Sequence, residues 1–425
     1  MVQSPTADST PGVDVRVAPQ QQNLGIKRFK ATLPPNSLPI DMTATPPEAT
    51  SPTEESLESL RHAQQLAWLA SGANIEVGDS RALPWTVDAL AQTRGDEAHV
   101  VQRLESGLTA VVFQLRSAGQ DWTLKRARPQ ALVRNLDGQT SFLNEVQRRA
   151  DLRALKQQPG GQARWAGIVD TAYASFQDGL ILSPWIAGQS VRHWDERQLQ
   201  QLLDTACALW TEGFFEWDLC AGNILDDGQQ VYLFDFGYMY RFDPRCQFSS
   251  AGDGRNEPLF HPAERFETRN YCATLLQLEH SEGIDAALKA FRTEKAIAIE
   301  AYRRMRHSIA ARGAQAHVLA WLDGWVQRWS EALKGDLQTL YQQENWRSHV
   351  LDLDDDLRGQ TCTPMTIKRA DWLLWSLQEH FKDLKRSGAF FWGDIGKSQS
   401  QLIAKYTAHK HQAQHYQIPS PKRCG

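Results

Sequence analysis

The chain has 425 residues, of which 41% are hydrophobic. This size fits one large domain with additions, or two to three domains, and allows a sizeable core. Its 46 Lys and Arg against 50 Asp and Glu give a formal net charge of −4, which does not indicate a nucleic-acid partner or a membrane surface. No run approaches about 18 apolar residues, and no apolar segment opens the chain, so we expect neither a membrane span nor a Sec-type signal peptide.

The cysteines are scattered along the chain, and no two of them form a Cys-x-x-Cys pair. This spacing favours free thiols in a reducing compartment over a disulfide framework or a zinc site. The six positions are Cys207, Cys220, Cys246, Cys272, Cys362 and Cys424.

Residues 1–50 contain eight of the 19 prolines, with many Ser, Thr and Gln. A segment of this composition buries too little apolar surface to offset its ordering entropy, so it predicts a disordered leader. Two interpretations follow. A plain solvated tail fits a cytoplasmic protein, whereas a localisation signal fits a protein secreted into a host cell by a non-Sec route.

Residues 51–97 predict a short helical segment. Ser51-Pro52-Thr53-Glu54 has the form of a capping box with Pro at the first helical position. Apolar residues follow at helical spacing until Gly72, which we expect to end the helix. A second short helix is expected at Trp85–Gln92.

From residue 98 to residue 185 the apolar period changes mostly to that of strands. A helix interrupts the strands, and another helix, which begins near Asp195 with Gln198 as its capping partner, follows them. The predicted strands are Val100–Leu104, Ala110–Leu115, Trp122–Ala127 and, after a hairpin at Ser175–Gly179, Leu180–Leu182; the predicted helices are Gln139–Leu155 and Asp195–Trp210.

Beyond residue 270 the pattern is almost wholly helical, with predicted helices at Ile284–Arg312, Gln315–Gln343 and Thr366–Lys385. Within the second helix a tryptophan recurs every four residues from Trp321 to Trp329. This stripe favours the core of a helical region over a binding platform.

Two polar stretches of the second half are expected to be solvated. The acidic run Leu351–Asp356 lacks the Gly and the terminal Glu of an EF-hand loop, which favours a solvent-exposed acidic loop over a cation site. Residues 386–425 are expected to form a tail in which His409, His411 and His415 are solvated.

Three polar residues between Glu216 and Gly237 have the spacing of a phosphoryl-transfer site: Asp218, Asn223 and Asp235. An aspartate orients an acceptor hydroxyl and takes its proton, whereas an asparagine and a second aspartate supply hard oxygen ligands for Mg²⁺ on ATP phosphates.

Upstream, Lys125 lies on a predicted strand and Glu145 lies in the following predicted helix. With the three residues above, this order resembles the protein kinase-like superfamily over about residues 98–270. The resemblance implies an α+β, bilobal protein kinase-like fold. Its β-rich N-lobe would span residues 98–185, and its helical C-lobe, with a large helical extension, would span residues 186–385.

The resemblance also implies roles by position and the cofactors ATP and Mg²⁺. Lys125 would anchor the nucleotide phosphates with Glu145 as its partner, and Asp218 would be the catalytic aspartate. The remaining positions would contact the nucleotide or its metal ion: Gly107 in the phosphate-covering turn, Pro184, Trp185 and Ile186 in the hinge, and Asn223 and Asp235 as Mg²⁺ ligands.

The chain departs from the protein-kinase pattern in its catalytic loop. Glu216-Trp217-Asp218 stands where His-Arg-Asp is usual, which removes the arginine that would pair with a phosphorylated activation loop. Cys220 stands where protein kinases keep a lysine that touches the γ-phosphate. In the phosphate-covering turn, only Gly107 of three usual glycines is present.

Two features bear on the acceptor. Gly222-Asn223-Ile224-Leu225 is similar to the loop of aminoglycoside and choline phosphotransferases, which act on small molecules. Pro262-Ala263-Glu264 resembles a permuted Ala-Pro-Glu motif that closes the activation segment of protein kinases. The sequence thus predicts an ATP- and Mg²⁺-dependent kinase, with a protein acceptor favoured. The alternatives are a small-molecule phosphotransferase with an acidic pocket beside Asp218, a nucleotide-binding pseudokinase or adaptor, and transfer of AMP or another group.

Overall fold

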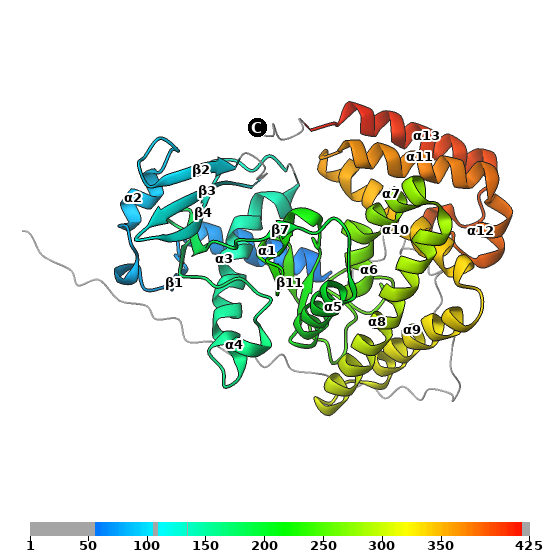
Figure 1. The fold of residues 1–425 in the computed structure, drawn as a ribbon, viewed down its shortest axis with the longest axis horizontal. Helices are drawn as coiled ribbons and strands as arrows, with labels where there is room; N and C mark the ends of the chain where they lie inside the picture. The colour runs from blue at the N-terminus through cyan, green and yellow to red at the C-terminus, as the bar shows by residue number, and fades with distance from the viewer. Residues whose placement is uncertain (1–55, 105–108, 134, 419–425) are drawn as a thin grey trace, which may run out of the picture. The chain divides into compact units, whose positions relative to one another are not determined.

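The computed structural model describes residues 56–104, 109–133 and 135–418 (Figure 1). Its N-terminal part is built on a six-stranded antiparallel sheet with the order β1-β5-β6-β4-β3-β2. Four of its strands, β2, β3, β4 and β6, match the strands predicted from the sequence; β5 is not among the predicted strands, and β1 lies in the segment expected to be helical. The six are β1 (Glu76–Gly78), β2 (Val100–Leu104), β3 (Ala110–Ser117), β4 (Gln120–Ala127), β5 (Tyr173–Ser175) and β6 (Leu180–Pro184).

The two faces of this sheet are covered by different helices, α2 (Val87–Gln92) and α3 (Leu136–Lys156). Successive strand residues point to opposite faces. On β4, Leu124 is buried in the apolar cluster that includes Leu90 of α2. The next residue, Lys125, therefore points to the other face, where α3 packs its Val146. The alternation on β4 thus directs the lysine toward α3.

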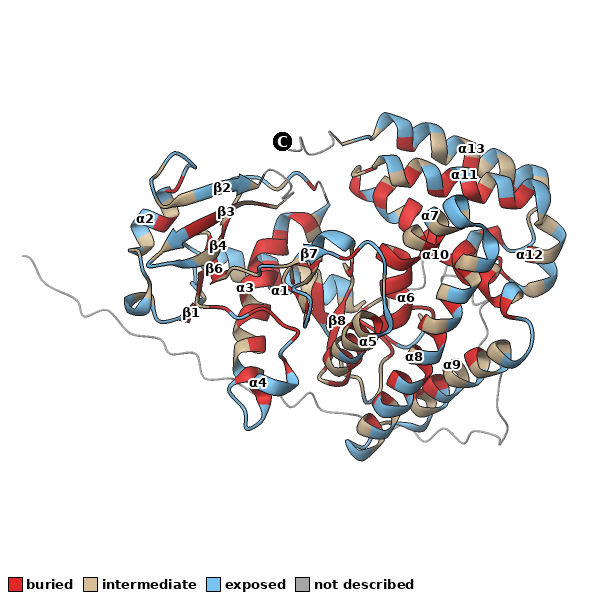
Figure 2. Cartoon of the chain, in the orientation of Figure 1, coloured by how far each residue is buried: buried red, intermediate tan, exposed pale blue. Residues whose placement is uncertain are grey.

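Helix α3 begins three residues before the predicted start at Gln139. The Asn135 side chain caps it by accepting a hydrogen bond from the Gly138 N–H group at 2.8 Å. Many residues of α3 are buried, as Figure 2 shows. A short helix, α4 (Gly161–Arg164), follows it.

Helix α1 (Leu57–Ala70) lies N-terminal to the sheet and contacts α3. Its cap is Ser56, whose side chain accepts the Ser59 N–H group at 3.1 Å. The predicted capping box at residues 51–54 lies outside the described residues. The helix ends before Gly72, as expected, and this glycine has a φ of 66° that favours glycine.

Short strands bracket the two predicted acidic site residues. Strand β8 (Phe214–Glu216) pairs with β11 (Met239–Arg241), and β9 (Ile224–Asp226) pairs with β7 (Gln189–Ser190) and β10 (Val231–Leu233). Helix α5 (Glu196–Thr211) precedes them and has the predicted capping box, formed by Asp195 and Gln198.

From Pro262 onward, the described chain is mostly helical. Trp321, Trp325 and Trp329 are buried, which confirms that their stripe faces a core. The α-helices are α6 (Pro262–Phe266), α7 (Cys272–Glu282), α8 (Ile284–Ala311), α9 (Ala316–Lys334), α10 (Leu337–Gly359), α11 (Pro364–Glu379), α12 (Phe381–Ser387) and α13 (Gln399–His415), with a π-helical turn at Glu267–Tyr271 and 3-10 turns at Ser80–Ala82, Ala221–Asn223 and Trp392–Asp394.

Two predicted helices are each two helices in the structure. The expected helix Gln315–Gln343 breaks at Gly335, and Asp336 then caps α10 by accepting the Thr339 N–H group at 2.9 Å. The expected helix Thr366–Lys385 breaks at His380, which leaves helical geometry with φ −124°. Apolar periodicity continues across both breaks, so it did not reveal them.

The prediction of a solvent-exposed acidic loop at Leu351–Asp356 is wrong. This run lies inside α10, with Leu353 fully buried and Asp352 and Asp356 largely buried. Arg269 and Arg369 pair with Asp352, and Arg269 also lies 3.7 Å from Asp356, which allows this face of α10 to be buried. Residues 386–425, expected as a tail, include α13, which packs on α11.

The histidines of this C-terminal segment differ in their exposure to solvent. His409 lies on α13 and is only partly exposed, with its Nδ1 atom 3.6 Å from Asp354 Oδ1. Its expected full solvation is therefore wrong, because α13 packs against the helices that carry Asp354 and its neighbours.

A buried ionic cluster lies between the π-helical turn, α8 and α10. Lys295 contacts Glu267, Glu344 and, at 3.3 Å, Glu294, and Arg347 contacts Glu267. All five side chains are fully buried. Charges removed from water in this way depend on one another, so the cluster ties these elements together.

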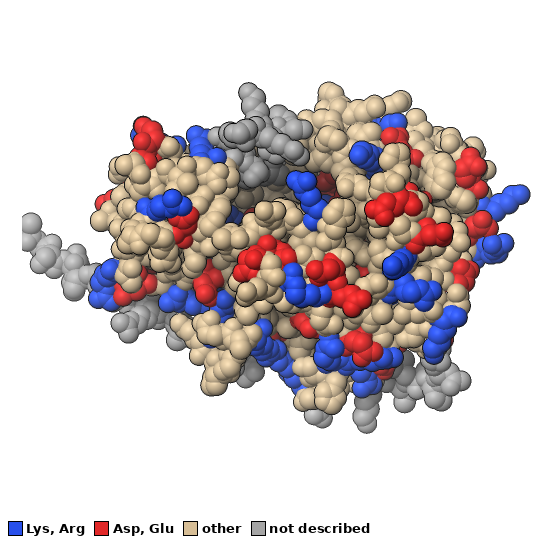
Figure 3. Space-filling model, in the orientation of Figure 1, with Lys and Arg blue, Asp and Glu red and all other residues tan. Residues whose placement is uncertain are grey.

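Two expectations drawn from the composition, on the cysteines and on membrane spans, can be compared with the structure. The five cysteines within the described ranges are free. No helix in the described part of the chain is long and apolar enough to cross a membrane. On the face in Figure 3, acidic and basic side chains are interspersed.

Candidate active site

Lys125 joins two acidic residues from distant parts of the chain. Its Nζ atom lies 2.5 Å from Glu145 Oε2 and 3.0 Å from Asp235 Oδ2. Burial by itself would lower the lysine pKa, but the carboxylates of Asp235 and Glu145 raise it above its ordinary value. The predicted contact between Lys125 and Glu145 is present, and Lys125 is held as a cation between two carboxylates.

Arg149 supports this arrangement from the next turn of α3. Its Nη2 atom lies 2.9 Å from Glu145 Oε1 and donates to the Phe234 carbonyl at 2.5 Å, while Nη1 donates to Ser183 Oγ at 3.2 Å. The Glu145 carboxylate is thus shared between Lys125 and Arg149. These bonds join α3 to β6 and to the residues that lead into Asp235.

Asn144 holds the Asp235-Phe236-Gly237 segment against α3. Its side-chain amide donates to the carbonyls of Phe236, Gly237 and Met239 at 3.3, 3.0 and 2.9 Å. Asn144 is buried, so these bonds form away from water. The backbone that carries Asp235 is therefore fixed to the helix that carries Glu145.

Asp218 lies between β8 and the 3-10 turn Ala221–Asn223. The amide of Asn223 donates to both the carbonyl and Oδ2 of Asp218 at 3.0 Å each. The Asp218 side chain keeps 23% of its surface exposed, so the carboxylate is accessible. The Asp-to-Asn spacing of five residues places the two side chains in direct contact.

Glu216 holds the backbone of Asp218 in place. Its Oε1 atom accepts the Asp218 N–H group at 2.8 Å, and its Oε2 atom is buried without a hydrogen-bond partner among the described residues. Burial, with further contributions from Asp218 and Asp235, raises the Glu216 pKa well above its usual range. Glu216 is therefore a buried carboxyl group whose ionised form is disfavoured, and its bond to the Asp218 N–H group orients the loop.

Asn223 and Asp235 each keep an oxygen that a cation could use. Asp235 Oδ1 accepts only the Gly237 N–H group, at 3.3 Å, and Asn223 Oδ1 accepts no hydrogen bond from the described residues. Burial would raise the Asp235 pKa, but Lys125 and the Gly237 N–H group hold it below its usual range, so Asp235 is ionised. This donor set fits a small hard cation such as Mg²⁺. No hydrogen bond joins Asn223 to Asp235 in the described part of the chain.

The structure describes three of the other four predicted nucleotide contacts. Pro184 ends β6, and the Trp185 N–H group donates to the Asp121 carbonyl at 3.1 Å. Ile186 packs against the core of the helical part. Gly107 lies outside the described residues. The segment at 184–186 therefore connects the sheet to the helical part, and its Trp185 N–H group is already bonded.

Arg269, which the sequence did not single out, reaches Asp218 from the π-helical turn Glu267–Tyr271. Its Nε atom donates to Asp218 Oδ1 at 3.1 Å, and its Nη1 atom pairs with Asp352 of α10. Burial would lower the arginine pKa, but Asp352 and Asp218 raise it well above its ordinary value. Only the fold brings these three residues together, because no local pattern links them.

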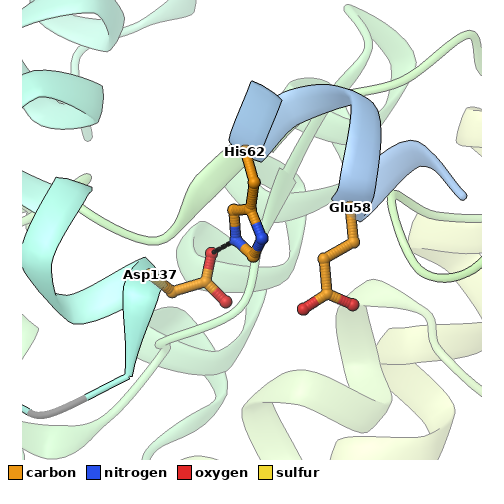
Figure 4. A group of neighbouring side chains, drawn as sticks. All are labelled: Glu58, His62 and Asp137. Carbon is orange, nitrogen blue, oxygen red and sulfur yellow. Dashed lines mark hydrogen bonds and ion pairs between the residues drawn. The ribbon is translucent and has the colours of Figure 1, made fainter. Parts of the chain in front are cut away.

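Glu58, His62 and Asp137 lie close enough to suggest a metal site (Figure 4). However, Asp137 Oδ1 already accepts hydrogen bonds from Arg61 Nη2 and the Tyr240 hydroxyl and contacts His62 Nε2, each at 2.9 Å. A guanidinium on the same oxygen repels a metal ion. The group instead connects α1 with the start of α3 and with β11.

Comparisons with known proteins identify no family. No family model matches the chain, and no curated protein matches it. One matching solved structure is that of the bifunctional kinase-methyltransferase WbdD, at 20% sequence identity and a TM-score of 0.23. The match covers 33% of this chain and 32% of the WbdD chain, so the chain matches about a third of that protein's length.

Proposed function

We propose that the chain is a kinase with a bilobal protein kinase-like fold, which transfers the γ-phosphoryl group of ATP to a hydroxyl. The observation that carries the proposal is the Lys125 Nζ atom, 2.5 Å from Glu145 and 3.0 Å from Asp235. An ammonium group held in this way presents fixed positive charge for phosphates, and the adjacent ionised Asp235 is suited to bind their metal ion.

The transfer step uses Asp218 as the base. The acceptor hydroxyl donates to the Asp218 carboxylate, its oxygen forms a bond to the γ-phosphorus, and its proton passes to Asp218 late in the step. The bond from the γ-phosphorus to the bridging oxygen breaks, and its electron pair stays on ADP. Mg²⁺, when bound by the oxygens of Asn223 and Asp235, would neutralise charge on the phosphates.

A protein acceptor is favoured over a cationic small molecule. The acidic run of α10 does lie near Asp218, as an acidic pocket requires. However, Asp352 is paired with Arg269 and Arg369, and Asp355 lies 3.5 Å from Arg265. Because three internal arginines compensate these carboxylates, little negative charge is left there to attract a cationic acceptor.

The test incubates the full-length protein with ATP and Mg²⁺, with and without protein acceptors, and follows products by mass spectrometry. We expect a protein mass increase of one phosphoryl group, which Asp218→Asn should slow strongly. A phosphorylated small molecule would keep the kinase assignment but overturn the protein acceptor. An AMP adduct would indicate another group transfer, and nucleotide binding without product would indicate a pseudokinase.

A further inference from the structure

The proposed chemistry needs a positive charge beside the γ-phosphate, and the catalytic loop does not supply one. Protein kinases keep a lysine two residues after the catalytic aspartate, where it touches the γ-phosphate. This chain has Cys220 there. Burial, with a further contribution from Asp218, raises the pKa of the Cys220 thiol well above its usual range, so the thiol is neutral and supplies no positive charge.

A π-helical turn presents Arg269 to the same carboxylate from elsewhere in the fold. This turn, Glu267–Tyr271, is a continuation of α6 and leads directly into α7. Isolated π-helical turns are uncommon and occur frequently at functional sites. Arg269 is 51 positions from Asp218 in the sequence, yet the Nε atom lies 3.1 Å from Asp218 Oδ1.

Two nitrogen atoms of the Arg269 guanidinium are bonded to carboxylates, and the third is not. Its Nε atom is bonded to Asp218 and its Nη1 atom to Asp352, which Arg369 also contacts at 2.8 Å. Its Nη2 atom has no hydrogen-bond partner among the described residues. Nor is it among the polar atoms of these residues that are both buried and without a partner. The Arg269 side chain is 21% exposed. The Nη2 group is therefore fixed beside Asp218 and accessible from solvent.

A fixed guanidinium with a free N–H pair is suited to bind phosphate oxygens. Its charge also counters the repulsion between an anionic base and an anionic phosphoryl group, which otherwise opposes their approach. Two oxygens of Asp218 have several lone-pair sites, so the bonds from Arg269 and Asn223 still leave room for an acceptor hydroxyl.

We propose that Arg269 is a catalytic residue whose Nη2 group binds the γ-phosphoryl oxygens of ATP while its Nε group holds Asp218. This inference rests on the proposed kinase function. In the transfer step, Arg269 forms and breaks no covalent bond. It stabilises the charge on the γ-phosphoryl oxygens as the acceptor oxygen bonds to phosphorus and ADP leaves with the electron pair of the broken bond.

The experiment compares two nucleotides that differ in the γ-phosphate. Calorimetry measures binding of Mg²⁺-ADP and of the non-hydrolysable Mg²⁺-AMP-PNP to the full-length wild type and to Arg269→Gln. We expect Arg269→Gln to weaken AMP-PNP binding on the order of 10- to 100-fold, the usual range for a charged hydrogen bond, and to change ADP binding less than about threefold. The control Arg306→Gln removes an exposed pair with Asp323 on α8 and α9 and should change neither affinity.

Equal weakening of both nucleotides by Arg269→Gln, or no weakening of either, would overturn this inference and leave the kinase proposal intact. A wild type that binds neither nucleotide would overturn both. If Arg269→Gln fails to fold, as judged by the loss of cooperative melting, Arg269→Lys replaces it. A lysine keeps the charge but cannot bridge Asp218, Asp352 and a phosphate together, so it should show a smaller loss that is still confined to AMP-PNP.

Discussion

The Nζ atom of Lys125 lies 3.0 Å from Oδ2 of Asp235, a residue 110 positions further along the chain. This contact connects the six-stranded sheet to the segment that leaves β10. It places one cation and one anion side by side, as the proposed site for a metal-bound nucleotide requires. The proposed nucleotide binding should therefore be sensitive to substitution of either residue.

Lys125→Met should weaken ATP binding and reduce turnover on the order of 10- to 100-fold, because the charged contact to the phosphates is lost. The fold should remain, since Arg149 still pairs with the Glu145 carboxylate at 2.9 Å. Calorimetry with Mg²⁺-ATP and a thermal melt measure the two effects. Lys125→Arg should not restore activity, because a planar fork replaces a compact charge. Wild-type affinity and rate in Lys125→Met would refute the role assigned to this lysine.

Asp235→Ala should abolish the Mg²⁺-dependent part of nucleotide binding, because it removes an ionised oxygen ligand. The measurement is the shift in melting temperature that ATP causes, with Mg²⁺ and with EDTA. In the wild type, we expect the shift in Mg²⁺ or Mn²⁺ only, whereas the variant should give the same small shift in both media. An ATP-induced shift in wild type that EDTA leaves unchanged would speak against a metal site here.

Asp218→Asn should lower kcat by a factor on the order of 10² to 10⁴, the usual range for a positioned general base. In the wild type, the Asn223 amide donates to the backbone carbonyl of Asp218, and the substitution leaves that carbonyl in place. We therefore expect ATP affinity to stay within about threefold of wild type. Single-turnover transfer at saturating ATP is the measurement. A variant rate within about threefold of the wild-type rate would leave the mechanism without its base.

Asp356 should make the protein less stable as the pH rises. Burial, with a further contribution from Asp352, raises its pKa to about 7, although Arg269 and Arg369 and the Thr366 hydroxyl act in the opposite direction. Because the folded-state pKa lies above the unfolded value of about 3.9, the folded protein retains a proton that the unfolded chain has lost. The stability due to this group is complete below pH about 4 and is lost as the pH rises through about 7.

Asp356→Asn removes this titration and keeps an oxygen for the Thr366 hydroxyl, which donates to Asp356. At pH 8 we expect the variant to be more stable than wild type, on the order of 1–3 kcal/mol, with a smaller difference at pH 5. Denaturant titrations at both pH values measure this. Asp323→Asn, at an exposed residue on α9, serves as the control and should change stability by less than about 0.5 kcal/mol. A greater advantage for Asp356→Asn at pH 5 than at pH 8 would contradict the sign.

Lys295→Met should destabilise the helical part by about 3–5 kcal/mol, because Glu267 and Glu344 lose a buried partner. The Lys295 ammonium also lies 4.8 Å from the centre of the Trp329 ring, so tryptophan fluorescence in denaturant should follow the change. The matched control is Arg303→Met, which breaks an exposed pair with Glu300 and should cost less than about 1 kcal/mol. Equal effects of the two substitutions would show that burial does not decide the value of the pair.

Local features of the fold could be predicted from the sequence. Alternation on β3 and β4 and the capping pair of Asp195 and Gln198 depend on neighbouring residues, and both appear in the structure. The contact between Lys125 and Glu145 followed from a strand residue and a helix residue in a familiar order, and it too is present. The helix breaks at Gly335 and His380 were missed because apolar periodicity continues across them.

The tertiary structure alone decided which charges meet. Arg269 belongs to no sequence motif. The acidic run of α10, considered with its sequence neighbours alone, has the composition of a solvated loop. Arg269 contacts Asp218, 51 positions away in the sequence, and Asp352 of the acidic run, 83 positions away. Apolar period reports which face of an element is buried, but an ion pair depends on the relative placement of two elements. A carboxylate that finds a guanidinium can be buried, and one that does not must stay in water, so the sequence determined the residue types and the packing of the helices determined their partners.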